Sequence, residues 1–519
     1  MEVITKQIET NRVERRLTNQ FMLDEDFNVP DSKNDVEKIV MSEGHVRIDE
    51  VKPVENYLRV QGKVEFQVLY VAEGFEPTFS CLEGKLPFVE MVYTEDGGDK
   101  NLDIKSVRVE LNTNMVHSRK LRIKAMVEME LESQKQNVEE IPTDVEDGGN
   151  IFKKQEKMEL LKLHTSKKDT YRIKEEMVLP GTKETIGVML WSDIVNRKLD
   201  TKLAVDELQL SGELLAFCFY ESPDGKIDWI EQTVPYQGRV ECYGVDETMY
   251  HHVQANLEEV HADIRVDEDG EMRIVGIEGT LQVCIAVYEE EQVDVLEDMY
   301  SLESNCVLET KDVEYEQLVL QNNSKCKVME RLTIPELKNE ILQICHSSGA
   351  IHVDRTVVRE DGVVVEGALY ISFLFVRAND NMPFDTWQGV VPFAHLIECQ
   401  EVEDNLTFHI SAVLEQLSIT LQGGDEIEVK AALAFHGFFK RNGTRKMIQD
   451  TKVLPLSMEE IEKRPSIVGY IVKPEDDLWS LAKRYSTSVE AIKELNDVSG
   501  EKLKAGDRLL IFKENMSIL

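Results

Sequence analysis

Long stretches of this chain alternate between apolar and polar residues with a period of two. In one stretch the apolar positions are Val60, Val64, Phe66, Val68 and Tyr70. The alternation returns over Leu208–Tyr220 and Val363–Phe375, and again over 121–131, 275–287 and 427–435. A period of two is typical of β-strands with one buried and one exposed face. The pattern therefore predicts antiparallel sheets that cover shared cores.

Recurring landmark residues divide these strands among three long repeats. Each repeat has a proline after an apolar residue, a glycine 32 residues later and an aromatic residue eight residues after the glycine. The landmarks are Pro30, Gly62 and Tyr70, then Pro180, Gly212 and Tyr220, then Pro335, Gly367 and Phe375. A tripeptide with a central proline follows at 86–88, 234–236 and 391–393. The periods of 150 and 155 residues indicate a tandem repeat.

Each repeat is predicted to be a β-sandwich-like domain with one short helix. The central glycine keeps the phase of the apolar face and predicts a close backbone approach or a bulge. Because a proline suits the first turn of a helix, helices are expected over Ser32–Val40, Thr182–Ile194 and Glu336–Ile344. The expected connections are Pro142–Asn150, a stretch around 297–312 and Met458–Ser466, which give domains over 1–145, 151–300 and 310–457.

The last segment predicts a small β-α-α-β module over 467–513. Gly469–Lys473 and Arg508–Phe512 have the composition of short strands. Between them, two helical faces are expected from Leu478, Leu481, Ala482 and Tyr485, and from Val489, Ile492 and Leu495. The candidate helix ends are Asp476 and Asp477 as caps, Thr487 with Glu490 as a capping box, and Asn496 as a left-handed stop.

This segment resembles a LysM module. The resemblance rests on three runs that occur in order, namely W-S-L-A-K-R-Y, S-V-x-x-I-x-x-L-N and A-G-D-x-L-x-I. In glycan-binding members of that family, the loops before the first helix and after the second line a sugar groove. The resemblance implies a partner- or glycan-binding groove at Pro474, Glu475, Asp476, Asp477, Leu478, Trp479, Asn496, Asp497 and Val498.

The first of these loops departs from the family pattern. The family usually has Gly, Asp and Thr there, whereas this chain has Glu475 and Asp477 around Asp476. The added negative charge disfavours peptidoglycan, whose stems and lactyl groups are anionic. Trp479 lies off the apolar helix face, and two interpretations stay open. It either covers the edge of the small core or is an exposed anchor for a partner.

Charge and targeting signals limit the expected partners and the expected cellular location. The net charge is −39, while 467–513 holds eight basic and eight acidic residues, so the acidity lies in the repeats. An acidic surface disfavours nucleic acid and suits a basic or polar protein partner, or is simply a solvated surface. The sequence shows no transmembrane run and no signal-peptide pattern, so a cytosolic protein is expected. The eight scattered cysteines lack a CxxC and are expected to be reduced.

Candidate chemistry is sparse along the chain. The glycine pairs at 97–98, 148–149 and 423–424 suit turns, because none belongs to a phosphate-binding motif. His251, His252 and His261 are a weak metal candidate, since no cysteine or carboxylate pair has matching spacing. The sequence therefore predicts no catalytic site, no cofactor and no metal, and only a pocket with converging titratable groups would support an enzyme.

Three β-rich repeats before one LysM module are similar to the SPOCS-plus-LysM architecture of SipL-type sporulation proteins. The resemblance implies a non-enzymatic adaptor of spore-coat morphogenesis in the mother-cell cytosol, recruited to the forespore surface. It also implies that the LysM module docks a SpoIVA-type ATPase, the basement layer of the coat, while the repeats bind further coat components or self-associate. The alternative is a peptidoglycan-binding protein of the cell wall or cortex.

Overall fold

The computed structural model describes residues 2–74, 78–94, 102–146, 151–378, 383–400, 402, 405–457, 466–498, 500 and 503–513. The expected connection Pro142–Asn150 is wrong over its first part, because the strand that begins at Lys120 continues to Val145, while 147–150 lie outside the described residues. The expected connection Met458–Ser466 lies outside them except for Ser466, as do the glycine pairs at 97–98 and 148–149. The connection expected around 297–312 is a two-residue turn, Leu302 and Glu303, between two long strands.

Within the described residues, six strands form each repeat. Repeat 1 contains β1 (Val3–Asn28), β2 (Val36–Val54), β3 (Tyr57–Ala72), β4 (Thr78–Tyr93), β5 (Leu102–His117) and β6 (Lys120–Val145). Repeat 2 contains β7 (Ile151–Val178), β8 (Val188–Ala204), β9 (Glu207–Glu221), β10 (Ile227–Glu241), β11 (Tyr250–Val266) and β12 (Met272–Ser301). Repeat 3 contains β13 (Ser304–Thr333), η1 (Pro335–Leu337), β14 (Ile341–Arg359), β15 (Gly362–Arg377), β16 (Phe384–Glu398), β17 (Leu406–Gly423) and β18 (Glu426–Pro455).

Each repeat folds as a sandwich of two three-stranded antiparallel sheets. In repeat 1 the sheets have the strand orders β1-β6-β5 and β2-β3-β4, and repeats 2 and 3 have the same topology. The apolar positions of the alternating pattern meet between the sheets; Val60, Phe66 and Val127, for example, lie in the core of repeat 1. The prediction of tandem antiparallel sandwiches is confirmed.

The glycine and tripeptide landmarks mark one cross-strand contact. Gly62 lies opposite Phe88, and the same register pairs Gly212 with Tyr236 and Gly367 with Phe393. A Cβ atom on Gly212 would lie 2.2 Å from the Tyr236 ring, and one on Gly367 would lie 2.1 Å from the His352 carbonyl oxygen. The aromatic ring thus covers a strand position where no side chain fits, which explains why both landmarks recur together.

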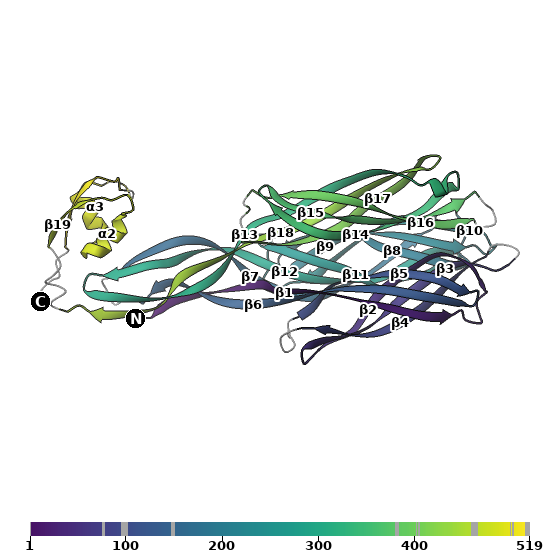
Figure 1. Cartoon of the computed structure of the whole chain (residues 1–519), viewed down its shortest axis with the longest axis horizontal. Coiled ribbons are helices and arrows are strands. Elements are labelled where there is room, and N and C mark those ends of the chain that lie inside the picture. Colours follow the sequence, from purple (N-terminus) through teal and green to yellow (C-terminus); the bar gives the residue numbers. More distant parts are fainter. Residues whose placement is uncertain are drawn as a thin grey trace.

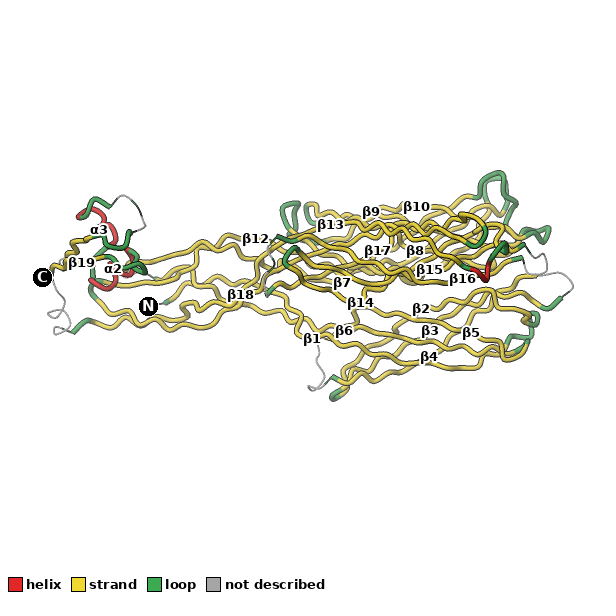
Figure 2. Tube along the Cα trace, turned by 45° about the horizontal axis from the view of Figure 1, so that its top comes forward, coloured by secondary structure: helices red, strands yellow, loops and turns green. Residues whose placement is uncertain are grey.

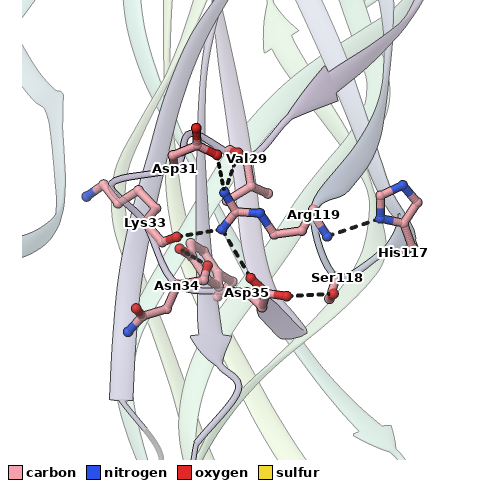
Figure 3. Close-up of polar contacts among 9 residues, drawn as sticks. Val29, Asp31, Lys33, Asn34, Asp35, His117, Ser118 and Arg119 are labelled. Atoms are coloured by element: carbon pink, nitrogen blue, oxygen red, sulfur yellow. Dashed lines mark hydrogen bonds and ion pairs between the residues drawn. The ribbon is translucent and has the colours of Figure 1, made fainter.

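The proline landmark of repeat 1 begins a turn held by polar contacts, shown in Figure 3. Arg119 donates hydrogen bonds to the carbonyl oxygens of Val29 (3.1 Å) and Lys33 (2.7 Å) and pairs with Asp35 at 3.1 Å. The landmark Tyr70 donates its hydroxyl proton to the Asn34 carbonyl oxygen at 3.0 Å. These contacts satisfy the turn carbonyls without a helix.

The same turn recurs in repeat 2 and changes in repeat 3. Tyr220 donates to the Glu184 carbonyl oxygen at 3.2 Å, and Arg273 to that of Lys183 at 2.8 Å. Repeat 3 has Phe375 and Asp425 at these places and forms the 3₁₀ turn η1. The helices expected over Ser32–Val40, Thr182–Ile194 and Glu336–Ile344 are not formed apart from η1, because β2, β8 and β14 begin within those segments.

The first and last strands of each repeat are longer than the others and continue beyond the sandwich. β1 and β6 stay paired from Asn28 opposite Lys120 to Val3 opposite Val145, and β7–β12 and β13–β18 do likewise. These three strand pairs lie together as a narrow stem that projects from the wider body (Figures 1 and 2). The stem encloses an apolar core made of Ile8, Ile141, Met158, Leu160, Val293, Val295, Val313 and Met447. A second apolar cluster nearer its tip contains Val145, Leu296, Met299 and Ile448.

The three sandwiches also meet around an apolar cluster remote from the stem, which we term the repeat junction. Phe79, Phe219 and Phe384, one from each repeat, contact one another with ring centroids 5.0, 5.4 and 5.7 Å apart. Buried neighbours from all three repeats complete the junction, namely Val40, Leu69, Val71, Leu190, Trp191, Phe217, Cys345 and Leu374. Because cores are shared at both ends, the repeats form one body.

Replacing Gly367 with alanine should destabilise repeat 3. The new methyl group would meet the His352 carbonyl oxygen and the Phe393 ring, and overpacking of this kind costs about 1–3 kcal/mol. Urea unfolding of the full chain should show a lower midpoint. Gly181→Ala, at a position with no atom within 4 Å of the new methyl group, is the matched control, and equal midpoints for both variants would contradict the close contact.

Candidate functional site: the LysM-like head at the tip of the stem

The C-terminal segment folds in the predicted β-α-α-β order. It contains β19 (Ile467–Ile471), α2 (Leu478–Tyr485), α3 (Val489–Leu495) and β20 (Arg508–Phe512), with the two strands paired antiparallel. The apolar faces of both helices pack on the sheet and bury Val472, Leu478, Leu481, Ala482, Ile492, Leu509 and Ile511. We call this unit the head.

The helix caps explain several of the polar residues in the candidate groove. Asp477 caps α2, because its carboxylate accepts a hydrogen bond from the Ser480 amide at 2.5 Å. The capping box expected at Thr487 and Glu490 is replaced by Ser488, whose hydroxyl accepts from the Ala491 amide at 3.2 Å. Asp477 therefore has a structural role in addition to its charge.

The second groove loop differs from the sequence prediction by one residue. Asn496 has φ −112°, and the left-handed residue is Asp497 with φ 51°. Asn496 instead joins α3 to β20, since its side chain donates to Leu510 O at 2.8 Å and accepts from Leu510 N at 2.7 Å. This bidentate contact holds the loop in place and leaves Asp497 exposed and Val498 half-buried.

The first groove loop is ordered around Asp476. Its carboxylate accepts hydrogen bonds from the Lys473 amide at 2.8 Å and the Tyr470 hydroxyl at 2.7 Å, and these donors hold the pKa of Asp476 below its usual value. Pro474 and Glu475 are exposed. Of the nine predicted groove residues, Leu478 belongs to the head core. The exposed ones are Pro474, Glu475, Asp477 and Asp497.

Trp479 contacts the stem of its own chain. Its indole nitrogen donates to the Asp298 carboxylate at 2.8 Å, and its ring packs edge-on against Tyr300 with centroids 4.9 Å apart. Asp298 also accepts from Lys483 at 2.5 Å. Trp479 is half-buried and packs against the core of the head, and the stem surface that it contacts is the end of β12.

Tyr300 is the centre of the contact between the head and the stem. It is 4% exposed, stacks on Phe152 at 5.0 Å and donates its hydroxyl proton to the Thr487 carbonyl oxygen at 2.9 Å. The sequence analysis missed Phe152, Asp298 and Tyr300, because an aromatic residue near the end of an alternating strand looks like any other strand residue. The head is thereby fixed to the tip of the stem that repeat 2 provides (Figure 1).

Comparison with known families agrees with both parts of this architecture. The family described as the SPOCS domain of SipL matches 35–116, 185–265 and 340–422, and the LysM domain family matches 470–512. The chain has the SipL-type architecture. No curated protein and no solved structure matches the chain.

The SPOCS matches cover the inner strands of each repeat. They span β2–β5, β8–β11 and β14–β17, so the long first and last strands, which build the stem, lie outside the matched segments. SPOCS and LysM domains are non-catalytic binding modules. This SipL-type chain therefore joins binding modules of two kinds through the stem.

The weaker candidates do not converge on a site. His251 faces Thr201 at 2.9 Å, and burial lowers the pKa of His252 to about 3. Within the described residues, no group of three or more His, Cys, Asp or Glu side chains is arranged to hold a metal. Among the same residues, no helix is long and apolar enough to span a membrane.

Asp298→Ala should release the head from the stem. The substitution removes the acceptor for the half-buried Trp479 indole and for Lys483, and hydrogen bonds to a charged group contribute about 1.5–3 kcal/mol. Small-angle X-ray scattering of the full chain should show a broader distribution of long distances. Asp294→Ala, at an exposed position on the same strand, is the control, and an unchanged profile for Asp298→Ala would show that Tyr300 alone holds the head.

Proposed function

We propose that this chain is a non-enzymatic adaptor of spore-coat assembly in the mother cell. The LysM head docks a SpoIVA-type basement-layer ATPase at the forespore surface, and the SPOCS repeats over 1–145, 151–300 and 310–457 form the scaffold for further coat components. The coarser role, sporulation-related binding, follows from the SipL SPOCS and LysM domains themselves.

The observation that carries the proposal is the position of the head. A stem built from strands of all three repeats holds it away from the body, so a partner can approach the head without meeting the acidic sandwiches. The contacts of Trp479 and Tyr300 join the head to the tip of this stem, and the paired strands of the stem continue into the scaffold. An adaptor needs this separation between its two binding parts.

The chemistry of the head favours a protein over a glycan as its ligand. Glu475 is exposed and Asp477 caps α2, which adds negative charge where the sugar groove of LysM modules lies. Anionic peptidoglycan would be repelled there, whereas a basic or polar protein surface would be attracted. Trp479 follows this loop and is half-buried against Tyr300, so a partner would contact the part of the indole that Tyr300 leaves exposed, and tryptophan is enriched at binding hot spots.

Trp479→Glu should weaken capture of the SpoIVA-type ATPase by the full chain roughly 30-fold, the effect of losing a hot spot of about 2 kcal/mol. Asp298→Ala distinguishes the contact of Trp479 with the stem from its proposed contact with the partner. This substitution frees the head from the stem but leaves the indole in place. We expect Asp298→Ala to retain capture in a quantitative pull-down. If both variants lose capture equally, the partner recognises the docked head and stem together.

A fluorescent fusion of the full chain tests the wider role. During sporulation it should concentrate at the forespore surface and become diffuse with Trp479→Glu. A wild-type signal that ignores the forespore would refute the proposal.

Peptidoglycan binding in the wall or cortex is the second candidate, because the LysM family match itself favours it. Co-sedimentation of the full chain with purified peptidoglycan should be weak. Glu475→Gly combined with Asp477→Thr restores the residues usual in the family while keeping a helix cap, and should increase it. Strong binding by the wild-type chain would favour the second candidate.

A further inference from the structure

The repeat junction contains one buried histidine that joins two repeats. His346 lies on β14 of repeat 3 and is 4% exposed. Its Nε2 is 2.8 Å from Asp193 on β8, and its Nδ1 is 2.6 Å from Glu231 on β10. Both carboxylates belong to repeat 2, and the ring stacks on Phe217 of the same repeat with centroids 4.0 Å apart.

The geometry around His346 defines its charge. Each ring nitrogen faces a carboxylate oxygen, and an ionised carboxylate can only accept hydrogen bonds. A neutral imidazole carries a single N–H and would leave one nitrogen lone pair against a carboxylate. Only the imidazolium donates on both sides, so this contact is a charged bridge between repeats.

Other charged groups from repeats 1 and 2 face the same place. Arg197 lies on β8, the strand of Asp193, and is 7% exposed. Its positive charge partly balances the carboxylates of Asp193 and Glu231. Glu43 and His45 lie on β2 of repeat 1, where Glu43 is half-buried and His45 is exposed, and partial burial together with the charge of Asp193 raises the pKa of Glu43. The bridge is therefore the centre of a polar cluster to which all three repeats contribute.

The three repeats differ at this position. Strand register makes His346 equivalent to Met41 in repeat 1 and Trp191 in repeat 2, since they pair with Leu374, Leu69 and Phe219 respectively. Met41 and Trp191 contribute only apolar contact to the junction. Among the three equivalent positions, the titratable contact thus occurs at the one where repeat 3 meets repeat 2.

We propose that His346 is a protonation-dependent latch that holds repeat 3 against repeat 2 at the end of the body remote from the stem. When His346 is protonated, the ring bridges Asp193 and Glu231 and the junction stays closed. When His346 loses this proton, the lone pair of one ring nitrogen faces a carboxylate. The buried negative charge of Asp193 is then balanced by Arg197 without His346. The end of the body then opens, while the stem still holds the repeats together.

The direction of the pH dependence follows from the folded-state values. Burial opposes the charge on His346, but the hydrogen bonds to Asp193 and Glu231 outweigh it and raise the pKa of His346 from 6.5 to about 9. The stabilisation is fully present below pH 6.5 and is lost as the pH rises through 9. The raised pKa of Glu43 acts in the same direction, because its neutral form is the one favoured in the closed junction.

Hydrogen exchange of the full chain between pH 6.5 and 10, corrected for intrinsic exchange rates, tests the latch. Protection of the β14 segment around His346 should fall by up to about 300-fold, which is the linkage limit for the shift from 6.5 to about 9. Stem strands such as β7 should keep their protection. Unchanged protection of β14 across this range in the wild-type chain would overturn the proposal.

A pair of variants distinguishes the effect of His346 from a general loss of protein stability at high pH. His346→Met with Asp193→Asn introduces the residue of repeat 1 and removes the charge that would otherwise stay buried and unpaired. Both this double variant and its control carry Glu43→Gln, so that the second group with a raised pKa does not titrate. In this background the double variant should remove the pH dependence of β14 protection, whereas His352→Gln, on the same strand but partly exposed, should keep the profile of Glu43→Gln alone. Alkaline loss of protection in the double variant would overturn the proposal.

Discussion

Continuous backbone pairing between the first and last strands of each repeat is the constraint on which the architecture depends. β12 pairs with β7 inside the sandwich of repeat 2 and continues to Ser301 opposite Ile151 at the tip of the stem. The pairing passes through one-residue register shifts at Val287/Tyr288 and Leu296/Asp298, and bulges of this kind bend and twist a strand pair without ending it. The sandwich cores therefore fix the geometry of the stem, and the stem fixes the place of the head.

The features that the sequence could predict were local. Alternation gives the strands, and the recurrence of Gly212 and Tyr236 with their counterparts gives the repeats, since both patterns depend on contacts inside one sandwich. The helix expected after each proline failed for a related reason. Proline at a segment start suits either a helix or a turn, and the deciding contact, such as Arg119 on Val29 and Lys33, comes from the turn between β5 and β6, about 90 residues away.

Period-two alternation does not predict which repeats share a core or where the head docks. One signal was present: Phe217, Cys218, Phe219 and Tyr220 form a continuous apolar run, and burial on both faces of a strand is what such a run indicates. For the head, the sequence predicted the strands, the helix faces and the Asp477 cap. The partner of Trp479 could not be predicted, because Asp298 and Tyr300 lie about 180 residues earlier in the chain.

The stem core also sets an order for folding during synthesis. Ile8 belongs to the first strand to be made, yet it packs in one cluster with Met447 of the last long strand. Each sandwich can form when its own six strands exist, whereas the stem must wait for β18. Contacts so distant in sequence close slowly, so the N-terminal half of β1 and its partner in β6 remain as an incomplete, apolar-faced strand pair until repeat 3 is finished. The repeats consequently fold as neighbours first and become one body only at the end.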